Sequence, residues 1–341
     1  MNTTTYGLDI AKTVFQLYWV EPSGKSFNRS FSRPKLIEFL ARREPGRVVL
    51  EACGSAHWWA RQLRALGHEA VLLHARYVRP FVQRNKTDAA DAKAIWTAAQ
   101  QPDMPVVAAK TEAQQAMLGL HSLRQLRVKI RTMLVNQLRG LLYEFGVSIR
   151  PGMRAGLQEI VQRMDEIEQS LPPVLFMCVR EQLQSLAQLD EVIGRLEQHI
   201  ETLGREDRSC RAILAIPGIG MLTATAMVAT IGDARTFKSG RQLAAYLGLV
   251  PKQTGTGGKV RLGGISKRGD PYLRTLLIHG ARAVLSHLRR KNQGSWSEAL
   301  AQRRPTNVVA VAMANKTVRT VWALLAHERT YDRDYVSVRP A

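Results

Sequence analysis

The chain has 341 residues, enough for two or three domains and a sizeable hydrophobic core. Hydrophobic residues make up 45% of it and aromatic residues 6%, which is typical of a globular protein and excludes a largely disordered one. Its 49 lysines and arginines against 28 acidic residues give a net charge of +21. The expected partner is therefore a polyanion, nucleic acid ahead of an anionic membrane, because each neutralised phosphate releases a condensed counterion.

The cysteines and the N-terminus indicate a cytoplasmic protein. Cys53, Cys178 and Cys210 are odd in number and far apart, so they fit neither a disulfide framework nor a zinc-binding spacing. The first residues are polar and lack the apolar segment of a signal peptide. The longest apolar run near the C-terminus, 308–325, carries a lysine and an arginine, so it is predicted to be a buried helix and not a membrane span.

The N-terminal part predicts a mixed sheet covered by helices. β-Branched and aromatic runs predict strands, with an antiparallel start, at 4–10, 14–20, 25–30, 47–51 and 69–73. Helical patterns occupy 35–42 and 56–66, and a further helix begins near residue 87. This order of three strands, then helix, strand, helix, strand and helix, is that of the ribonuclease H-like fold.

Two acidic residues fall in informative places in these strands. Asp9 lies within the first apolar strand, where a carboxylate costs free energy unless it is paired or bound to a metal. Glu51 ends the fourth strand, and functional sites collect at the carboxyl ends of strands in such sheets. If the first and fourth strands are neighbours, both side chains point into one cleft. Taken singly, each residue can also be explained as a strand edge or a solvated strand end.

Two further acids begin the next helix. Asp88 and Asp91 are three residues apart in the stretch 85–93 and therefore share one helix face. A simpler explanation is that Thr87 caps the helix and the two acids favour its dipole. Together with Asp9 and Glu51, however, they form a set of oxygen ligands suited to Mg²⁺ or Mn²⁺, and a two-metal site of this kind performs phosphodiester chemistry.

The middle of the chain is predicted to be helical. Leucines and isoleucines recur every three or four residues from 123 to 145, and a coiled-coil-like pattern runs from 183 to 203. Between 120 and 155 there are seven lysines and arginines and one acid, Glu144. The pattern fits a self-packed helical spacer as well as an arm for dimerisation or nucleic-acid binding.

Glycines mark two further candidate contacts with nucleic acid. In the sequence Ile-Pro-Gly-Ile-Gly, Gly218 and Gly220 precede a helix and could present backbone N–H groups to phosphates, as in a helix-hairpin-helix, or could simply form a turn between packed helices. The segment 251–270 is predicted to be a glycine-rich loop without the spacing of a P-loop. From 251 to 291 there are ten basic residues and one acid, so this loop is expected to contact a phosphate backbone, and its hydroxyl groups are candidate nucleophiles. Asp270 and Pro271 are predicted to start the next helix.

These motifs together resemble the DEDD transposases of the insertion-sequence 110 family, most closely its 1111 branch. The similarity covers essentially the whole chain and is carried by five segments in the same order: Gly-Leu-Asp-Ile-Ala-Lys, Glu-Ala-Cys-Gly-Ser, Asn-Lys-Thr-Asp-Ala-Ala-Asp-Ala, Ile-Pro-Gly-Ile-Gly and Leu-Gly-Gly-Ile-Ser-Lys-Arg-Gly-Asp. The resemblance implies a RuvC-like, ribonuclease H-fold catalytic domain at 1–105, a coiled-coil spacer at 106–208 and a mostly helical C-terminal transposase domain at 209–341. It also implies double-stranded DNA as substrate, a structured bridge RNA as guide, and a homo-oligomer, a dimer or a tetramer.

The resemblance implies a role for individual residues. Asp9, Glu51, Asp88 and Asp91 match the metal-binding acids, and Thr256 stands where the family has its serine nucleophile. Threonine keeps the hydroxyl group but is β-branched and stiffer. The alternatives are Ser266 as nucleophile or a weakened enzyme. The residues expected to contact nucleic acid are Lys86, Gly218, Gly220, Lys259, Arg261, Ser266, Lys267 and Arg268.

The expected reaction is Mg²⁺-dependent strand exchange through a covalent protein–DNA intermediate, with base pairing to the RNA reading the sequence. Two alternatives remain open at this point. One is a RuvC-like nuclease that uses a metal-activated water, and the other is a non-enzymatic, basic nucleic-acid-binding protein.

Overall fold

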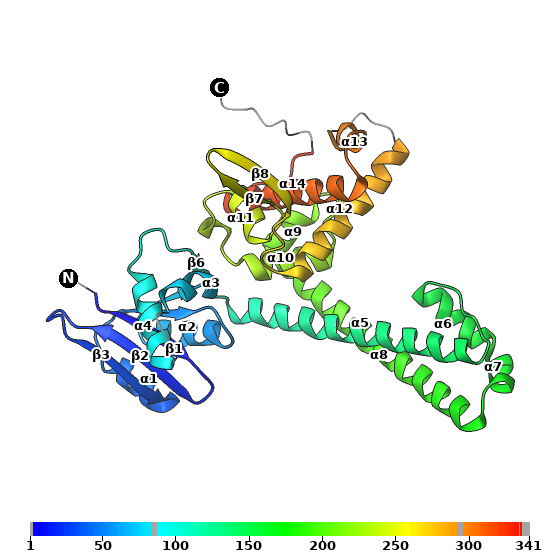
Figure 1. The fold of residues 1–341 in the computed structure, drawn as a ribbon, viewed down its shortest axis with the longest axis horizontal. Coiled ribbons are helices and arrows are strands. Elements are labelled where there is room, and N and C mark those ends of the chain that lie inside the picture. The colour runs from blue at the N-terminus through cyan, green and yellow to red at the C-terminus, as the bar shows by residue number, and fades with distance from the viewer. Residues whose placement is uncertain (1–2, 83–86, 292–295, 334, 336–341) are drawn as a thin grey trace. The chain divides into compact units, whose positions relative to one another are not determined.

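The structure is a computed structural model that describes residues 3–82, 87–291, 296–333 and 335, and it divides into two compact units (Figure 1). Unit 1 contains Met1–Gln115 and Ile231–Ser239, and unit 2 contains Ala116–Thr230 and Gly240–Ala341. The division into parts 1–105, 106–208 and 209–341 stays a prediction.

Unit 1 is built on a six-stranded mixed sheet. Its strands are β1 (Thr5–Ile10), β2 (Val14–Val20), β3 (Ser26–Ser32), β4 (Arg47–Glu51), β5 (Glu69–Leu73) and β6 (Val106–Val107). Their order in the sheet is β3-β2-β1-β4-β5-β6, with β4 parallel to both β1 and β5 and the other pairs antiparallel. The predicted antiparallel start and the predicted proximity of the first and fourth strands are confirmed. The two-residue β6 was not predicted, because it is too short to show a periodic pattern.

Helices cover both faces of this sheet. They are α1 (Arg33–Ala41), α2 (Ala56–Ala65), α3 (Ala75–Val78), the 3₁₀ turn η1 (Arg79–Phe81) and α4 (Asp88–Ala99); unit 1 also contains the 3₁₀ turn η2 (Ala234–Thr236). On one face, Leu8 and Leu50 pack with Leu36 of α1 and Trp59 of α2 in the main apolar cluster. On the other face, a second cluster joins residues of β4 and β5 to α4. Because successive side chains along each strand point to opposite faces of the sheet, the two apolar clusters form separate cores.

Gly7 allows α4 to lie directly on β1. A Cβ atom at this position would come within 2.4 Å of the carbonyl oxygen of Ala92 and 2.7 Å of the backbone nitrogen of Trp96. Backbone atoms cannot move aside as the end of a flexible side chain can. Only glycine fits here without displacing the helix, which packs on β1 two residues before Asp9.

We expect Gly7→Ala to destabilise unit 1 by about 1–3 kcal/mol, the usual cost of forcing a methyl group into a packed interior. The measurement is urea unfolding followed by tryptophan fluorescence. Gly54→Ala is the matched control, because a Cβ atom there meets nothing within 4 Å. Equal unfolding midpoints for the two variants would contradict the close packing of α4 on β1.

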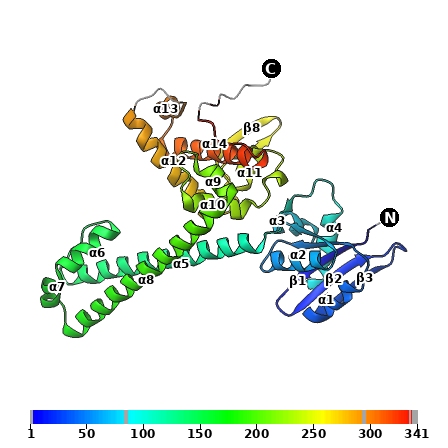
Figure 2. The same cartoon turned by 180° about the vertical axis from the view of Figure 1, so that it is seen from behind.

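Unit 2 is helical apart from one hairpin. Its helices are α5 (Glu112–Glu144), which begins in unit 1, α6 (Met153–Gln162), α7 (Met164–Ser170), α8 (Pro173–Glu206), α9 (Arg208–Leu214), α10 (Met221–Ile231), α11 (Gly240–Tyr246), α12 (Pro271–Lys291), α13 (Trp296–Ala301) and α14 (Thr306–Ala326). Helices α5 and α8 run side by side, with α6 and α7 at their far end (Figures 1 and 2). Leu138, Leu142, Ile160 and Leu186 are among the buried residues that join these helices in one apolar cluster.

The segment predicted to be a glycine-rich loop is a β-hairpin, so that prediction was wrong. Strand β7 (Pro251–Thr256) pairs antiparallel with β8 (Lys259–Ile265) around Gly257 and Gly258, whose φ angles are +56° and +76°. Two glycines with positive φ form the kind of two-residue turn that matches the twist of a hairpin. The sequence carried that signal, but the number of glycines in the strands obscured it.

Helix α14 passes the length and composition test for a membrane span, as core helices of soluble proteins also do. It contacts α9, α11, α12 and α13. Its buried residues, including Val309, Ala314 and Val318, lie at helical spacing on one face. It thus forms part of the core of unit 2.

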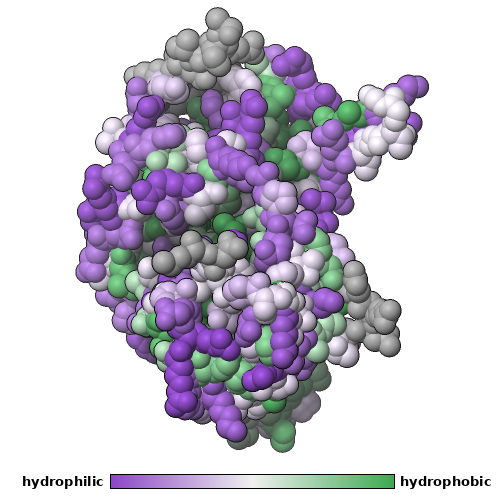
Figure 3. Space-filling view, turned by 90° about the vertical axis from the view of Figure 1, so that its left-hand side faces the viewer, coloured by the Kyte–Doolittle hydropathy of each residue, from purple (hydrophilic) through white to green (hydrophobic). Residues whose placement is uncertain are grey.

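The surface seen in Figure 3 is largely hydrophilic, with apolar residues scattered among polar ones, in keeping with the strongly basic composition.

A buried histidine links three helices of unit 2. His121 of α5 has Nδ1 2.9 Å from Tyr272 Oη of α12 and Nε2 3.0 Å from Thr225 Oγ1 of α10. Because the Thr225 hydroxyl donates to the carbonyl of Met221, it accepts from His121 Nε2–H, and Nδ1 accepts from Tyr272. Burial, followed by the charge of Arg124, lowers the pKa of His121 to about 4. The neutral imidazole is thus fully satisfied.

The stability of unit 2 should therefore fall as pH falls from about 6.5, the ordinary histidine pKa, to about 4. In this window the unfolded chain binds a proton at His121 that the folded chain does not. We expect His121→Gln, which can hydrogen-bond to both neighbours, to flatten the fall in urea midpoint between pH 7 and pH 5. Carboxylates contribute equally to both proteins, so identical pH profiles would contradict the assignment of a neutral His121.

Candidate active site

Asp9 and Glu51 lie side by side on one face of the sheet. Leu8 of β1 pairs with Leu50 of β4 in a parallel register, so the next residue along each strand is one of the two acids. Both are half-buried, and alternation directs them away from the main core that Leu8 and Leu50 enter. The sequence prediction that these acids share one site depended on this strand order, which the sheet provides.

Cys53 lies in the negative electrostatic potential of Asp9 and Glu51. Its thiol pKa is raised by burial and then by the charges of Glu51 and Asp9. Both carboxylates therefore act on the same sulfur atom two residues beyond β4. The sequence analysis attached no role to Cys53, and only the strand order brings it near Asp9.

Asp88 and Asp91 occupy the first turn of α4. Thr87 caps the helix, because its Oγ1 accepts a hydrogen bond from the backbone N–H of Ala90 at 3.2 Å. Asp88 is exposed and Asp91 is half-buried. The prediction that Thr87 caps this helix is thus confirmed. It does not exclude the second explanation, because the capped turn belongs to the helix that covers the sheet face of Asp9 and Glu51.

A row of polar side chains connects this helix start to the sheet. Asp9 pairs with Gln16 across β1 and β2, and Gln16 pairs with Ser30 across β2 and β3. Gln16 Oε1 accepts from Ser30 Oγ at 2.7 Å, and its Nε2 donates to Asn28 Oδ1. Asn28 Nδ2 in turn donates to the carbonyl of Ala89 in α4 at 2.9 Å. The row fixes the turn that carries Asp88 and Asp91.

The sequence analysis did not identify these three polar residues. The signal was present, because Gln16 is a polar residue inside the otherwise apolar run of β2. Its meaning depends on the register that places it opposite Asp9.

The structure places the four acids as two pairs, Asp9 with Glu51 on neighbouring strands and Asp88 with Asp91 at the start of α4, and convergence of all four in one cleft stays a prediction. Within the described residues, no three acidic, histidine or cysteine side chains lie close enough together to form a ready metal-binding group. The donor chemistry nevertheless fits a hard cation such as Mg²⁺, because every candidate ligand is a carboxylate oxygen. Lys86, a predicted nucleic-acid contact next to this helix, lies outside the described residues.

The hairpin of unit 2 has two different faces. Its register places Thr256 opposite Lys259 and Thr254 opposite Arg261, so two hydroxyls and two cations share one side of the ribbon. Gly255 and Gln253 lie opposite Val260 and Leu262 on the other side. Every residue of β7 is exposed, and Thr256 is next to the turn. A two-stranded ribbon of this kind fits the major groove of duplex DNA.

The base of the hairpin is tightly held. Gly248 has a φ of +74°, and a Cβ atom there would lie 2.0 Å from the carbonyl oxygen of Arg268. The buried guanidinium of Arg274 donates from Nη1 to the carbonyls of Leu247, Arg268 and Gly269, at 3.2, 2.7 and 3.0 Å. These contacts position the turn that exposes Arg268. The sequence analysis did not identify Arg274, because nothing in its local pattern distinguishes it from a surface arginine.

Ser266 and Lys267 belong to the same turn. The backbone N–H of Ser266 donates to the carbonyl of Val250, and that of Lys267 donates to the carbonyl of Gly248. Ser266 Oγ is buried and has no hydrogen-bond partner among the described residues. Lys267 is exposed and has a φ of +53°. A buried hydroxyl is poorly placed to attack a phosphate, whereas the exposed Thr256 is accessible.

Gly218 and Gly220 lie between α9 and α10, as predicted, but in different surroundings. A Cβ atom at Gly218 would lie 2.9 Å from the carbonyl oxygen of Gly280 in α12, so this glycine permits close helix packing. Gly220 is exposed, and a Cβ atom there would meet nothing within 4 Å. The backbone contact with phosphate stays a prediction for both.

Comparison with known proteins identifies the chain. Residues 210–296 match the family described as "Transposase IS116/IS110/IS902 family", and residues 6–146 match the transposase family DEDD_Tnp_IS110. The chain is 46% identical to a "Probable family 20 transposase" of Pseudomonas aeruginosa, over 97% of this chain and 99% of the relative. It is 39% identical to the "Transposase for insertion sequence element IS1111A" of Coxiella burnetii, over 95% of this chain and 90% of the relative. It is also 37% identical to the transposase of element IS1328 of Yersinia enterocolitica, over 97% of this chain and 99% of the relative.

The two family matches cover both units, and the match over residues 6–146 includes all four candidate metal-binding acids. The relatives are aligned over nearly their whole lengths, so the similarity is not confined to one domain. The chain is therefore a DNA transposase of the IS110 family of insertion sequences.

Proposed function

We propose that this transposase performs divalent-metal-dependent, RNA-guided strand exchange through a covalent link between Thr256 and DNA. The observation that supports this most directly is the adjacency of Asp9 and Glu51 on parallel strands, beneath the helix that begins with Asp88 and Asp91. We infer a ribonuclease H-like, RuvC-type arrangement of unit 1 from this placement and from the strand order.

The acids would hold the cation and orient the scissile phosphate. Mg²⁺ or Mn²⁺ bound by these carboxylates would supply Lewis-acid polarisation of the phosphoryl oxygens. The row of Gln16, Asn28 and Ser30 bonds the start of α4 to the sheet and would thereby keep the acids on the helix in a fixed position relative to those on the strands.

Thr256 would be the nucleophile. Its Oγ1 forms a bond to phosphorus while the bond from phosphorus to the 3′ oxygen breaks, and the hydroxyl proton is balanced by protonation of that leaving oxygen. A freed 3′-hydroxyl then attacks the link on the other strand, which releases Thr256 without net hydrolysis. Lys259 lies directly across the ribbon and would hold the phosphate that is attacked.

The remaining exposed cations would bind the nucleic-acid backbone. Arg261, Lys267 and Arg268 are exposed and would contact phosphates, which carry no sequence information, so sequence choice would belong to a pairing RNA. Ser266 would support the turn that presents Lys267 and Arg268.

A homo-oligomer is the expected working form. Leu126 and Met133 of α5 are 52% and 60% exposed and lie seven residues apart, the spacing of a second apolar seam. A dimer or tetramer built on this seam would place several catalytic units on two DNA substrates in the cytoplasm.

The test is recombination between two marked plasmids in the presence of the protein and the RNA that flanks its element. We expect joined products with wild type and none with Asp88→Ala. The hydrolytic alternative, in which a metal-activated water is the nucleophile, would instead give nicked DNA that does not depend on Thr256. Membership of a transposase family argues against the third interpretation, a purely architectural binder.

A further inference from the structure

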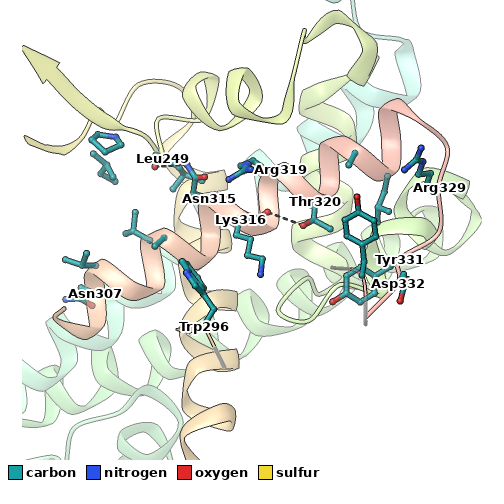
Figure 4. Close-up of a pocket in the computed structure, with 18 of the residues that line it drawn as sticks. Leu249, Trp296, Asn307, Asn315, Lys316, Arg319, Thr320, Arg329, Tyr331 and Asp332 are labelled. Carbon is teal, nitrogen blue, oxygen red and sulfur yellow. Dashed lines mark hydrogen bonds between the residues drawn. The ribbon is translucent and has the colours of Figure 1, made fainter. Parts of the chain in front are cut away.

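Unit 2 contains a large pocket between the base of the hairpin and α14 (Figure 4). Its volume is about 1260 Å³, above the usual range for small-ligand pockets. One wall is formed by a face of α14 that includes Val311, Asn315 and Lys316, and another by the hairpin residues Gly263 and Gly264. This α14 face is distinct from the buried face that enters the core.

The lining combines cations with aromatic rings. Among the described residues of the lining, Lys316, Arg319 and Arg329 contribute three positive charges, against one acid, Asp332. The aromatic residues are Trp296, Tyr331 and Tyr335, and in Figure 4 Trp296 and Tyr331 lie on the same side of α14 as the Lys316 side chain. Trp296 is 52% exposed, and Lys316 Nζ lies 5.5 Å from the centre of its ring.

This combination matches the chemistry of unpaired nucleotides. Proteins that bind single strands stack bases on aromatic rings and place cations along the phosphates. A duplex keeps its bases stacked inside, so its bases could enter the pocket only after extrusion. A purely apolar ligand would make no favourable electrostatic contact with the three cations of the lining, which makes it a poorer occupant.

The pocket is continuous with the hairpin. Pro251 and Ile265, which pair at the start of β7 and the end of β8, belong to the lining together with Gly263 and Gly264. A DNA strand laid along the cationic side of the ribbon therefore reaches the pocket at the ribbon's own base. Glycines at this border leave the entrance open, since a Cβ atom at Gly264 would meet nothing within 4 Å.

We propose that the pocket between α14 and the hairpin base binds an unpaired segment of DNA, with at least one base stacked on Trp296 and its phosphate near Lys316. The proposal deepens the proposed function, because it names the form of DNA that unit 2 receives next to Thr256. It concerns binding alone and requires neither the metal nor the covalent step.

The experiment measures binding without divalent metal, in EDTA. A fluorescent DNA single strand of about 12 nucleotides, within the range of known single-strand site sizes, is compared with the duplex and with RNA of the same sequence. The variants are Trp296→Leu, Lys316→Gln and Gly264→Phe, the last filling the entrance at a position with room for a side chain. Arg180→Gln, which removes a charge from an exposed site on α8, is the matched control.

We expect Trp296→Leu to weaken single-strand DNA binding about 5- to 150-fold, the range for one lost stacking contact, with duplex binding unchanged. Gly264→Phe should have a similar effect although it removes no charge. Irradiation of a strand containing 5-iododeoxyuridine should crosslink it to Trp296, Tyr331 or Tyr335, as located by mass spectrometry.

Three results would overturn the proposal. These are wild-type single-strand affinity in Trp296→Leu and Gly264→Phe, an effect confined to RNA, and a change of oligomeric state with no change in DNA binding. Asp88→Ala separates the two proposals. Loss of recombination in this variant tests the catalytic role of the acids, whereas its single-strand binding, which should equal that of wild type, tests the pocket alone.

Discussion

Thr256→Ala should eliminate the covalent protein–DNA adduct and lower strand exchange by at least about 10³-fold, as expected when a nucleophile is removed. Thr256→Ser should keep both activities, because it retains the hydroxyl and removes only the stiffening methyl group. The adduct is measured on a denaturing gel with labelled DNA, guide RNA and Mg²⁺. Alanine at this exposed ribbon position disturbs no packing, so the loss would be chemical.

Thr254→Ala is the matched control for this experiment. Thr254 lies two residues away on the same side of the ribbon and is paired with Arg261 as Thr256 is with Lys259. We expect it to form the adduct nearly as well as wild type. An adduct that survives Thr256→Ala but disappears in Ser266→Ala would assign the chemistry to Ser266 and require the buried hydroxyl to become accessible.

Asp9→Asn and Glu51→Gln should each lower strand exchange by about 10³-fold or more, while binding of DNA in EDTA stays the same or becomes tighter. Each substitution keeps the shape of the side chain and removes one charged oxygen ligand. The loss of a negative charge near the phosphates also reduces repulsion, which is why binding should not weaken. Activity is measured by plasmid recombination and binding by fluorescence anisotropy.

Glu69→Gln tests whether these effects belong to the site. Glu69 begins β5 and lies in register with Arg47, at the opposite end of the sheet from Glu51, and its side chain is 65% exposed. We expect wild-type activity from it. Direct titration with Mn²⁺, followed by calorimetry, should show weaker binding in Asp9→Asn and Glu51→Gln only. If all variants bind Mn²⁺ equally, the acids do not form the metal site.

The sequence predicted the sheet of unit 1 well because its signals are local. Runs such as Val48–Leu50 are apolar and β-branched, and turns separate them, so each strand is recognisable by itself. Only the strand order depends on residues far apart in sequence. The hypothesis that the first and fourth strands are neighbours was sufficient to predict that Asp9 and Glu51 lie close together. The register of the paired strands then supplied Gln16, which no local pattern could have connected with Asp9.

The site in unit 2 was harder to predict because it depends on backbone conformation and on distant packing. The sequence predicts a loop in place of the hairpin, because Gly255, Gly263 and Gly264 weaken the strand pattern of its flanks. The Arg274 guanidinium donates to the carbonyl groups of Leu247, Arg268 and Gly269, and this role appears only when α12 is placed against these turns. The pocket beside α14 likewise depends on elements far apart in sequence.

The hairpin that carries Thr256 is anchored at one end only. Arg274 and Gly248 fix its base, whereas the strands beyond are exposed, and an isolated two-stranded hairpin is at best marginally stable in water. We therefore expect contact with DNA along Lys259 and Arg261 to order its tip. The proposed nucleophile Thr256 would then be aligned only after DNA is bound, and part of the binding energy would be used to align it. The enzyme would therefore discriminate against free phosphates and stray DNA by leaving its attacking group unaligned until a complete substrate is in place.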